Sequence, residues 1–289
     1  MTNLANAPDE LVKVLQRQIP ECDIFIIKGL SQKNHDVIKN IITSNDDKSV
    51  IMHFHNLKYD AEYLELPHVK KIIHYHSEPS RVMLNIDDDY KKIVLNQYHC
   101  TLPEYENCEP VRNVFDYQES IVFNDKIKIG YYPSTTIRQN QYYDKGYDKT
   151  VPILRRIKEK YGDQIIIDIG TGMPYNKYID RKKDCHILID ECVTGSYHKS
   201  TIESLVMGTI VFCWMTDALV EKNNKIYGRI PPVINAKIDD LETKLIEHID
   251  MGIEKLEDMA LRANLEFTNY WSNDIIASEY AAIYDSLTN

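Results

Sequence analysis

The sequence lacks the features that would place it outside a reducing, aqueous compartment. None of its six cysteines forms a CxxC pair, so free, buried thiols are expected at positions 22, 100, 108, 185, 192 and 213. The first residues lack the apolar segment of a signal peptide. Apolar runs such as Thr209–Met215 fall far short of the ~20 residues that cross a bilayer. We therefore expect a soluble, cytoplasmic protein, in the host cytoplasm if the chain is viral.

Positive charge is also scarce. The 289 residues include 34 basic and 44 acidic side chains, which gives a net charge of −10. That average field repels a polyphosphate partner, so broad nucleic-acid binding is disfavoured unless basic side chains gather locally. The residues that could form such a basic groove are Lys28, Lys33, Lys39, Arg81, Lys91 and Lys92. Neither an internal repeat nor a low-complexity tract is visible.

What the sequence does contain is a regular alternation of strands and helices. Helices are predicted over Asp9–Gln18, from an N-cap at Ser31 through Ile42, over Thr150–Tyr161, and over Tyr197–Met207, which Gly208 ends. The predicted strands are Asp23–Leu30, Val50–His55, Lys71–His76, Lys92–Tyr98, Lys126–Tyr132, Gln164–Gly170, His186–Glu191, Thr209–Trp214 and Pro232–Ile234. The segment 101–117 is predicted to be irregular.

The alternation restarts near residues 118–126, which predicts an α/β protein with two Rossmann-like domains. Their continuously apolar strands are typical of parallel sheets covered on both faces. The N-terminal domain, 1–125, is reduced, and the C-terminal domain covers 126–270. Two such domains would leave a cleft between them, and because open parallel sheets bind ligands at the carboxyl ends of their strands, that cleft is the expected site.

The segment Gly195–Glu203 follows a predicted strand and opens a helix. Free amides and the helix dipole at such a position form an anion site. Ser196, either Lys199 or Ser200, and Glu203 would share one helix face, which would place a carboxylate below a bound phosphate and within reach of ribose hydroxyls. The alternative is a solvated polar face on which Glu203 pairs with a surface lysine.

The stretch DCHILIDECVTGSYHKSTIESLVMGTIVFCW resembles the nucleotide-binding region of family 4 and related glycosyltransferases of the GT-B type. In that family the second glutamate of a Glu-x7-Glu motif holds the ribose, and Glu203 matches it. Gly208 matches the glycine that ends the helix. Gly195 replaces the first glutamate, which leaves the donor sugar open.

Two further segments carry the same resemblance. IKIGYYPSTTIRQNQYYDKGYDKTVPIL is similar to the first strand and phosphate loop of the C-terminal domain, where Lys145 and Gly146 match the Lys-Gly step. Arg138 is the nearest arginine, and Ser134 stands where the loop approaches the phosphates. YWSNDIIASEYAAIYDSL resembles the helix that crosses back to the N-terminal domain, with the apolar stripe Trp271, Ile275, Ile276, Tyr280, Ile283 and Tyr284.

The N-terminal half carries four histidines on two predicted strands. By resemblance to the acceptor-side strands of the family, His76 lies near the donor sugar. Because i and i+2 share a strand face, His53 and His55, and likewise His74 and His76, allow a zinc site as an alternative. No Cys, Asp or Glu completes a typical metal spacing, and cores often hold satisfied histidines, so no metal is expected. The run 87–89 of three aspartates is expected to be a solvated turn rather than an acidic metal motif.

The resemblance implies transfer of a sugar from a nucleotide diphosphate sugar, expected to be a UDP-sugar, with retained configuration and with neither a metal nor a cofactor. The acceptor stays open between a glycan, a lipid-linked saccharide and a modified base of phage DNA. A non-catalytic nucleotide-binding or partner module is the alternative. The implied catalytic residues are His76, Lys145 and Arg138, and the donor-binding residues are Ser134, Lys145, Gly146, Gly195, Ser196, Tyr197 and Glu203.

Overall fold

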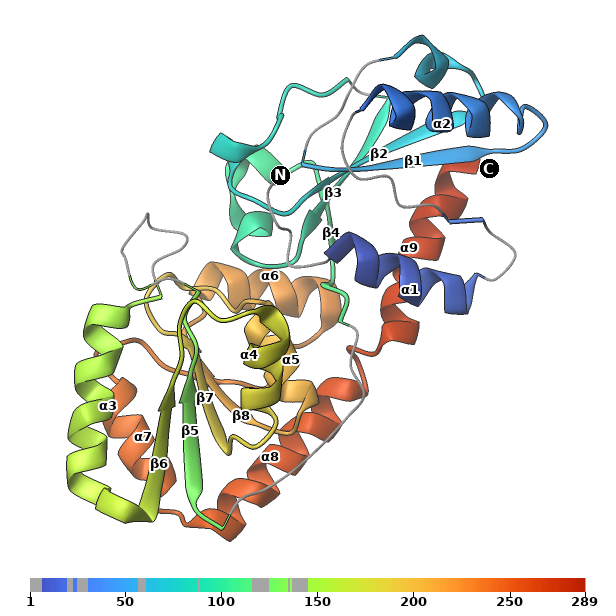
Figure 1. Cartoon of the computed structure of the whole chain (residues 1–289). Helices are drawn as coiled ribbons and strands as arrows, with labels where there is room; N and C mark the ends of the chain where they lie inside the picture. Colours follow the sequence, from blue (N-terminus) through green and yellow to red (C-terminus); the bar gives the residue numbers. More distant parts are fainter. Residues whose placement is uncertain are drawn as a thin grey trace. The chain divides into compact units, whose positions relative to one another are not determined.

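The computed structural model of the chain describes residues 7–19, 23–24, 31–56, 61–87, 89–115, 125–134, 136 and 145–288. It divides into two compact units, each coloured by sequence in Figure 1. Unit 1 comprises Met1–Asp116 and Trp271–Asn289, and unit 2 comprises Tyr117–Tyr270. Most of the predicted strand Asp23–Leu30 lies outside the described residues, as do Cys22 and Arg138.

Unit 1 is built on a four-stranded parallel sheet with the order β1-β2-β3-β4. Its strands are β1 (Val50–His55), β2 (Val69–Tyr75), β3 (Tyr90–Leu95) and β4 (Glu109–Val111). The helices are α1 (Ala7–Gln18), α2 (Gln32–Thr43) and α9 (Asn273–Thr288), with short 3-10 turns at Glu62–Glu65, Pro79–Arg81, Tyr98–Thr101 and Pro103–Tyr105. Ser31 caps α2 as predicted, because its hydroxyl accepts a hydrogen bond from the Asn34 amide.

The segment predicted to be irregular, 101–117, contains a strand. Residues Glu109–Val111 form β4, which pairs in parallel with β3 through Ile93 opposite Glu109. A proline inside so short a segment hides the strand in the sequence. Pro110 lacks an N–H to donate, and it is tolerated here because β4 is at the edge of the sheet.

The C-terminal helix α9 packs on α1 and on β4. The predicted stripe is its inner face, with Ile276, Tyr280 and Ile283 buried. Trp271, just before the helix, is fully buried and donates its indole N–H to the Asn113 carbonyl at 3.1 Å. Residues 271–288 are therefore part of the core of unit 1, although the whole of unit 2 separates them in sequence from the rest.

Unit 2 has a five-stranded parallel sheet with the order β6-β5-β7-β8-β9. The strands are β5 (Ile127–Tyr131), β6 (Ile165–Ile169), β7 (Ile187–Glu191), β8 (Ile210–Cys213) and β9 (Ile234–Asn235). The helices are α3 (Tyr147–Tyr161), α4 (Tyr175–Lys182), α5 (Lys199–Val206), α6 (Asp217–Tyr227), α7 (Leu241–Ile249) and α8 (Ile253–Thr268), with a 3-10 turn at Gly162–Gln164. In Figure 1, α3 and α7 lie together on one side of this sheet, and α5 and α8 pack together on the other.

The core of unit 2 forms where inward-facing strand residues meet these helices. Ile129, Ile187 and Phe212 are fully buried among side chains of α3, α7 and α8. Gly208 ends the α5 segment with φ +70°, as the sequence predicts. The helices α4, α6, α7 and α8 are not among the predicted elements, and α5 begins at Lys199 rather than at Tyr197.

The expectations about the cysteines and about membrane-spanning segments can be compared with the structure. The five described cysteines, Cys100, Cys108, Cys185, Cys192 and Cys213, are buried free thiols, which confirms that prediction. Among the described helices, none combines the length and apolar character needed to span a bilayer.

Candidate functional site

The strand order of unit 2 places a topological switch point between β5 and β7. The first strand of the unit, β5, has the second strand β6 on one side and the third strand β7 on the other. The connections after β5 and β7 therefore leave the sheet in opposite directions, which is the position at which open parallel sheets bind their ligands. Ser134 and the Lys145–Gly146 step follow β5, and the segment 190–203 follows or ends β7.

A buried ion pair lies at this switch point. The Lys145 ammonium is 3.1 Å from Asp190 Oδ1, and only 12% of the lysine side chain and 2% of the aspartate side chain are exposed. The other Asp190 oxygen accepts hydrogen bonds from the His198 amide at 3.0 Å and from the Thr201 hydroxyl at 2.7 Å. Burial raises the Asp190 pKa, but Lys145, His198 and Thr201 outweigh it and hold that pKa well below its ordinary value.

Lys145 is held from its backbone as well. Its carbonyl accepts a hydrogen bond from the Tyr131 hydroxyl at 2.7 Å, which ties it to the end of β5. The next residue, Gly146, is the N-cap of α3 and has φ +65°. A side chain there would put its Cβ 2.4 Å from Val193 Cγ2, so only glycine lets the start of α3 approach the loop after β7. The ammonium and the positive end of α3 therefore lie at the same edge.

The amides predicted to meet the phosphate have a different partner. Glu191 is fully buried, and its carboxylate accepts hydrogen bonds from the backbone amides of four successive residues. The distances are 3.2 Å to Val193, 2.6 Å to Thr194, and 3.1 Å to each of Gly195 and Ser196. The anion site predicted at Gly195–Ser196 is therefore filled by the protein's own carboxylate. The sequence reasoning missed Glu191, although a glutamate that ends a strand and precedes a small-residue loop was a usable signal.

The same loop requires glycine at position 195. Its φ is +86°, and a Cβ would lie 2.5 Å from Thr216 Cγ2. Its carbonyl accepts the Thr216 amide at 3.0 Å, which fixes the close approach of the segment after β8. In this backbone conformation a glutamate side chain does not fit at position 195. The glycine that replaces the first glutamate of the Glu-x7-Glu motif is therefore required by the backbone of this loop.

Ser196 and Tyr197 lie in the protein interior rather than on an open surface of the site. Both residues are fully buried, and the Ser196 hydroxyl donates to the Tyr197 carbonyl at 2.9 Å. Because α5 begins at Lys199, Ser196 lies in the preceding loop and does not share a helix face with Glu203. Ser134, by contrast, is exposed after β5.

Glu203 is neither solvated nor paired on the surface. It is 2% exposed, and one of its oxygens is 2.5 Å from the Lys182 ammonium, itself 4% exposed. The other oxygen accepts from the Tyr175 hydroxyl at 2.8 Å. Tyr175 begins α4 and is 37% exposed, so its phenol lies between Glu203 and solvent. A ribose hydroxyl would reach this carboxylate by replacing the Tyr175 hydroxyl.

His76 lies in unit 1, directly after β2, within a group of four histidines. Its amide donates to Asn56 Oδ1 at 2.7 Å, and its Nε2 is 2.7 Å from His55 Nδ1. His53 and His55 lie on β1, and His74 lies on β2 directly opposite His55. Burial lowers the pKa of His53 and His74 well below the ordinary value and that of His55 to about 4, so these imidazoles are neutral at neutral pH.

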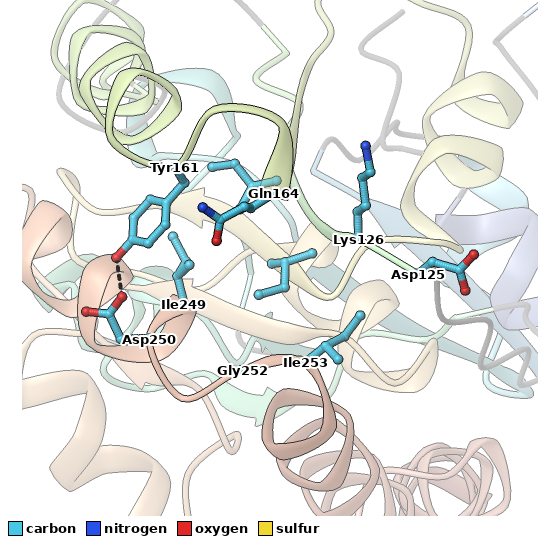
Figure 2. Close-up of a pocket in the computed structure, with 10 residues that line it drawn as sticks. Asp125, Lys126, Tyr161, Gln164, Ile249, Asp250, Gly252 and Ile253 are labelled. Carbon is cyan, nitrogen blue, oxygen red and sulfur yellow. Dashed lines mark hydrogen bonds between the residues drawn. The ribbon is translucent and has the colours of Figure 1, made fainter.

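A cavity of about 320 Å³ lies at the opposite end of the unit 2 strands, away from the switch point. Figure 2 shows its walls, where the Tyr161 hydroxyl donates to Asp250 at 2.6 Å. Lys126 and Gln164 line it directly before β5 and β6, so it opens at the amino ends of the strands. Parallel sheets of this kind bind ligands at the carboxyl ends, and the cavity is therefore separate from the switch-point site.

Comparisons with solved structures show the fold. A glycosyltransferase from Rickettsia africae matches with a TM-score of 0.54 and 15% identity, over 96% of this chain and 87% of that one. Anabaena HepE, solved with UDP, matches with a TM-score of 0.53 and 10% identity, over 95% and 89%. S. aureus TarM, solved with UDP, α-GlcNAc-glycerol and fondaparinux, matches with 0.54 and 10% over 76%, and this chain spans 52% of TarM. No protein-family model and no curated protein matches the sequence. The chain is an α/β protein with two parallel sheets and the fold of GT-B glycosyltransferases.

Proposed function

We propose that the protein is a glycosyltransferase that takes a nucleotide diphosphate sugar, a UDP-sugar in the first instance, at the carboxyl edge of β5 and β7. The observation that carries the proposal is the buried Lys145–Asp190 pair beside the start of α3, at the switch point of a GT-B fold. HepE was solved with both UDP and UDP-glucose, which supports the choice of nucleotide. The segments quoted for family 4 support a donor site of that type.

Lys145 has the properties that a pyrophosphate ligand needs. Its ammonium is fixed by Asp190, belongs to a side chain that is only 12% exposed, and lies next to the positive end of a 15-residue helix. A fixed cation in a poorly solvated site stabilises developing phosphate charge without first reorganising water. Glu203, buried behind Tyr175, supplies the carboxylate for the ribose.

The proposed step is a transfer with retained configuration. The bond between the anomeric carbon and the diphosphate oxygen breaks, and the nucleoside diphosphate leaves with the electron pair. An acceptor hydroxyl forms the new bond to the same carbon, and its proton passes to the departing phosphate. Lys145 offsets the charge that grows on the leaving group, which is the largest contribution such sites usually make. His76 and Arg138 remain proposals from the resemblance.

A saccharide or lipid-linked acceptor suits the charges better than nucleic acid. Of the residues considered for a basic groove, Arg81 pairs with Glu78 at 2.7 Å and Lys91 pairs with Glu109 at 2.6 Å. These carboxylates offset the positive charge that a DNA phosphate would need. The proposed acceptor is therefore a glycan or a lipid-linked saccharide.

A non-catalytic nucleotide-binding module is the second candidate, and one observation favours it. The loop amides that face a ligand in the prediction donate instead to Glu191. A thermal-shift screen with nucleotide sugars, followed by assay of free UDP after adding saccharide acceptors, separates the candidates. Binding with acceptor-dependent UDP release establishes the enzyme, and binding without release with any acceptor of a broad panel establishes the module.

The Lys145 assignment has its own test. A ligand at ~100 times its dissociation constant adds about 2.7 kcal/mol to stability, so loss of binding is readily measured. Lys145→Ala should weaken UDP-sugar binding at least about tenfold, whereas Lys160→Ala, an exposed lysine at the far end of α3, should not change it. Because Lys145→Ala leaves Asp190 buried without its cation, the double variant Lys145→Met, Asp190→Asn serves as the foldable version. Unchanged affinity in that double variant would contradict the donor site.

A further inference from the structure

Unit 1 contains a group of imidazoles that the proposed transfer does not use. His53, His55 and His74 each offer a ring nitrogen, and these three nitrogens lie within 4.8 Å of one another. Among the described residues this is the one group of three such side chains with metal-ligand spacing. The ring centres form a nearly even triangle, with separations of 4.7 Å between His53 and His55 and 5.4 Å from each of them to His74.

The fold explains why the rings converge. His53 and His55 are two residues apart on β1, so both point to the same face of the sheet. His74 lies directly opposite His55 in the parallel register of β1 and β2 and points to that face too. Two adjacent strands, rather than one loop, therefore fix the three side chains, which keeps the geometry rigid.

The expectation that these are satisfied core histidines does not hold. His74 is 1% exposed, yet neither of its ring nitrogens has a hydrogen-bond partner among the described residues. The buried Nε2 of His53 likewise has none in this part of the chain. A buried polar atom without a partner is destabilising, so three such atoms in one group point to a ligand.

A metal ion bound through one nitrogen of each ring would satisfy Nε2 of His53 and one nitrogen of His74. We propose that His53, His55 and His74 bind a borderline transition-metal dication, with Zn²⁺ as the reference ion. Three imidazoles at zinc bond lengths of about 2.0–2.1 Å place the ring centres roughly 5 Å apart, which matches the observed triangle. Ligand nitrogens around one zinc lie roughly 3.3 Å apart, whereas those of the triangle are separated by up to 4.8 Å. Metal binding therefore requires the rings to turn toward the ion, above all the nearly parallel rings of His53 and His55, whose planes differ by 8°. Neutral nitrogen ligands favour zinc and its neighbours over Mg²⁺ or Ca²⁺, which require oxygen.

The contacts around the triangle orient the rings for this role. His53 Nδ1 is 2.9 Å from the Tyr284 hydroxyl of α9. When Nε2 binds the metal, Nδ1 carries the proton and donates it to Tyr284, as the second nitrogen of a metal-bound histidine usually does. On the other side, His55 Nδ1 is 2.7 Å from His76, which leaves Nε2 of His55 for the metal. The site thus links β1, β2 and α9.

The test uses the full-length protein without a histidine tag. The protein is stripped with a chelator, loaded with Zn²⁺, dialysed, and analysed for metal per chain. We expect one zinc per chain, bound in competition with a chelator, and no displacement by a large excess of Mg²⁺. Co²⁺ in place of Zn²⁺ should give the visible absorption of a tetrahedral site. Absence of stoichiometric zinc, or equal retention of Mg²⁺, would overturn the proposal.

Matched variants locate the ion. His53→Gln and His74→Gln should each lower zinc affinity at least about tenfold, and Tyr284→Phe, which removes only the orienting hydroxyl, about tenfold as well. His68→Gln is the control, since His68 lies in the same unit but bonds the Ile42 carbonyl at 3.2 Å, away from the triangle. Circular dichroism confirms that each variant is folded. Equal loss of zinc affinity in His68→Gln, or no loss in His74→Gln, would show that zinc is not bound by the triangle of His53, His55 and His74.

The metal site and the proposed transfer fail separately. The proposed donor site lies in unit 2, and the transfer as proposed uses no metal, so the chelated protein should still be stabilised by a UDP-sugar. If zinc binds but the nucleotide does not, the transfer proposal fails alone. If the nucleotide binds and zinc does not, the metal proposal fails alone.

Discussion

At the scale of single residues, the candidate site is organised by two neighbouring carboxylates that the sequence reasoning did not single out. Asp190 holds the cation, and Glu191 holds the loop. Lys145 and Gly146 could be singled out in the sequence because their spacing resembles a known motif, and their role in donor binding is a proposal. The partners of Asp190 and Glu191 could not, because they depend on a tertiary turn whose amides fold back on a strand end. The same holds for Lys182, which is 21 residues from Glu203 in sequence and pairs with it in the core.

Gly195 allows the loop to be tested against an internal standard. Gly195 and Gly228 both have positive φ, +86° and +71°, but a Cβ would meet Thr216 at 2.5 Å only at position 195. Gly228→Ala should therefore cost about 1–2 kcal/mol of unfolding free energy, from backbone strain alone. Gly195→Ala should cost that amount plus the cost of the clash, about 1–3 kcal/mol more. Urea unfolding of the two variants checks this, and equal losses would show that the loop relaxes freely around position 195.

At the scale of secondary-structure elements, the predictions succeeded where burial produces a simple pattern. The continuously apolar strand predicted over Thr209–Trp214 matches β8, Ile210–Cys213, to within one residue at each end, because it is buried throughout and both faces of a parallel sheet are covered. Helix α4 was missed because Ile179 and Lys182 are its only buried residues, which leaves no apolar stripe to recognise. The start of α5 was set two residues early because Tyr197, fully buried in the preceding loop, imitates a core position of the helix.

The pairing of β5 with β7 provides a pH-dependent test. His186, just before β7, accepts the Lys128 amide of β5 through Nδ1 at 3.2 Å and is 1% exposed. Burial lowers its pKa below the ordinary value, although Glu257 and Asp184 act in the opposite direction. The folded state thus binds fewer protons than the unfolded state, and stability is lost as pH falls below about 6.5.

The expected size of this effect follows from linkage. While His186 stays neutral in the folded state, it lowers the free energy of unfolding by up to about 1.4 kcal/mol for each pH unit below pH 6.5. His186→Asn keeps an acceptor for the Lys128 amide but removes the titration, so its urea-unfolding curves should show a shallower loss of stability between about pH 6.5 and 5. Parallel pH profiles for the variant and the original protein would contradict the assignment.

At the scale of the whole molecule, the chain forms two units. The sequence marks the boundary between them only where the alternation of strands and helices restarts. The two parallel sheets and the α/β class were predictable from alternation, and the solved structures with this fold confirm them. The donor sugar and the acceptor were not, because they depend on side chains that surround a ligand rather than on periodicity. The assignment of 271–289 came from resemblance, and its physical basis is the buried Trp271 and the inner face of α9 in unit 1.

This arrangement predicts that destabilising substitutions in residues 271–288 lower the stability of unit 1 and not that of unit 2. Trp271 is fully buried, donates to the Asn113 carbonyl and lies 5.6 Å from the Arg112 guanidinium. Trp271→Ala should therefore cost about 3–5 kcal/mol, and hydrogen exchange should report the loss in residues 31–115. Leu265→Ala, at a position 63% exposed on α8, should cost less than about 0.5 kcal/mol. The sheet of unit 2 should keep its protection in Trp271→Ala, because its core contains no residue beyond 270. Equal loss of protection in both units would mean that the two fold as one cooperative body and that unit 2 depends on Trp271.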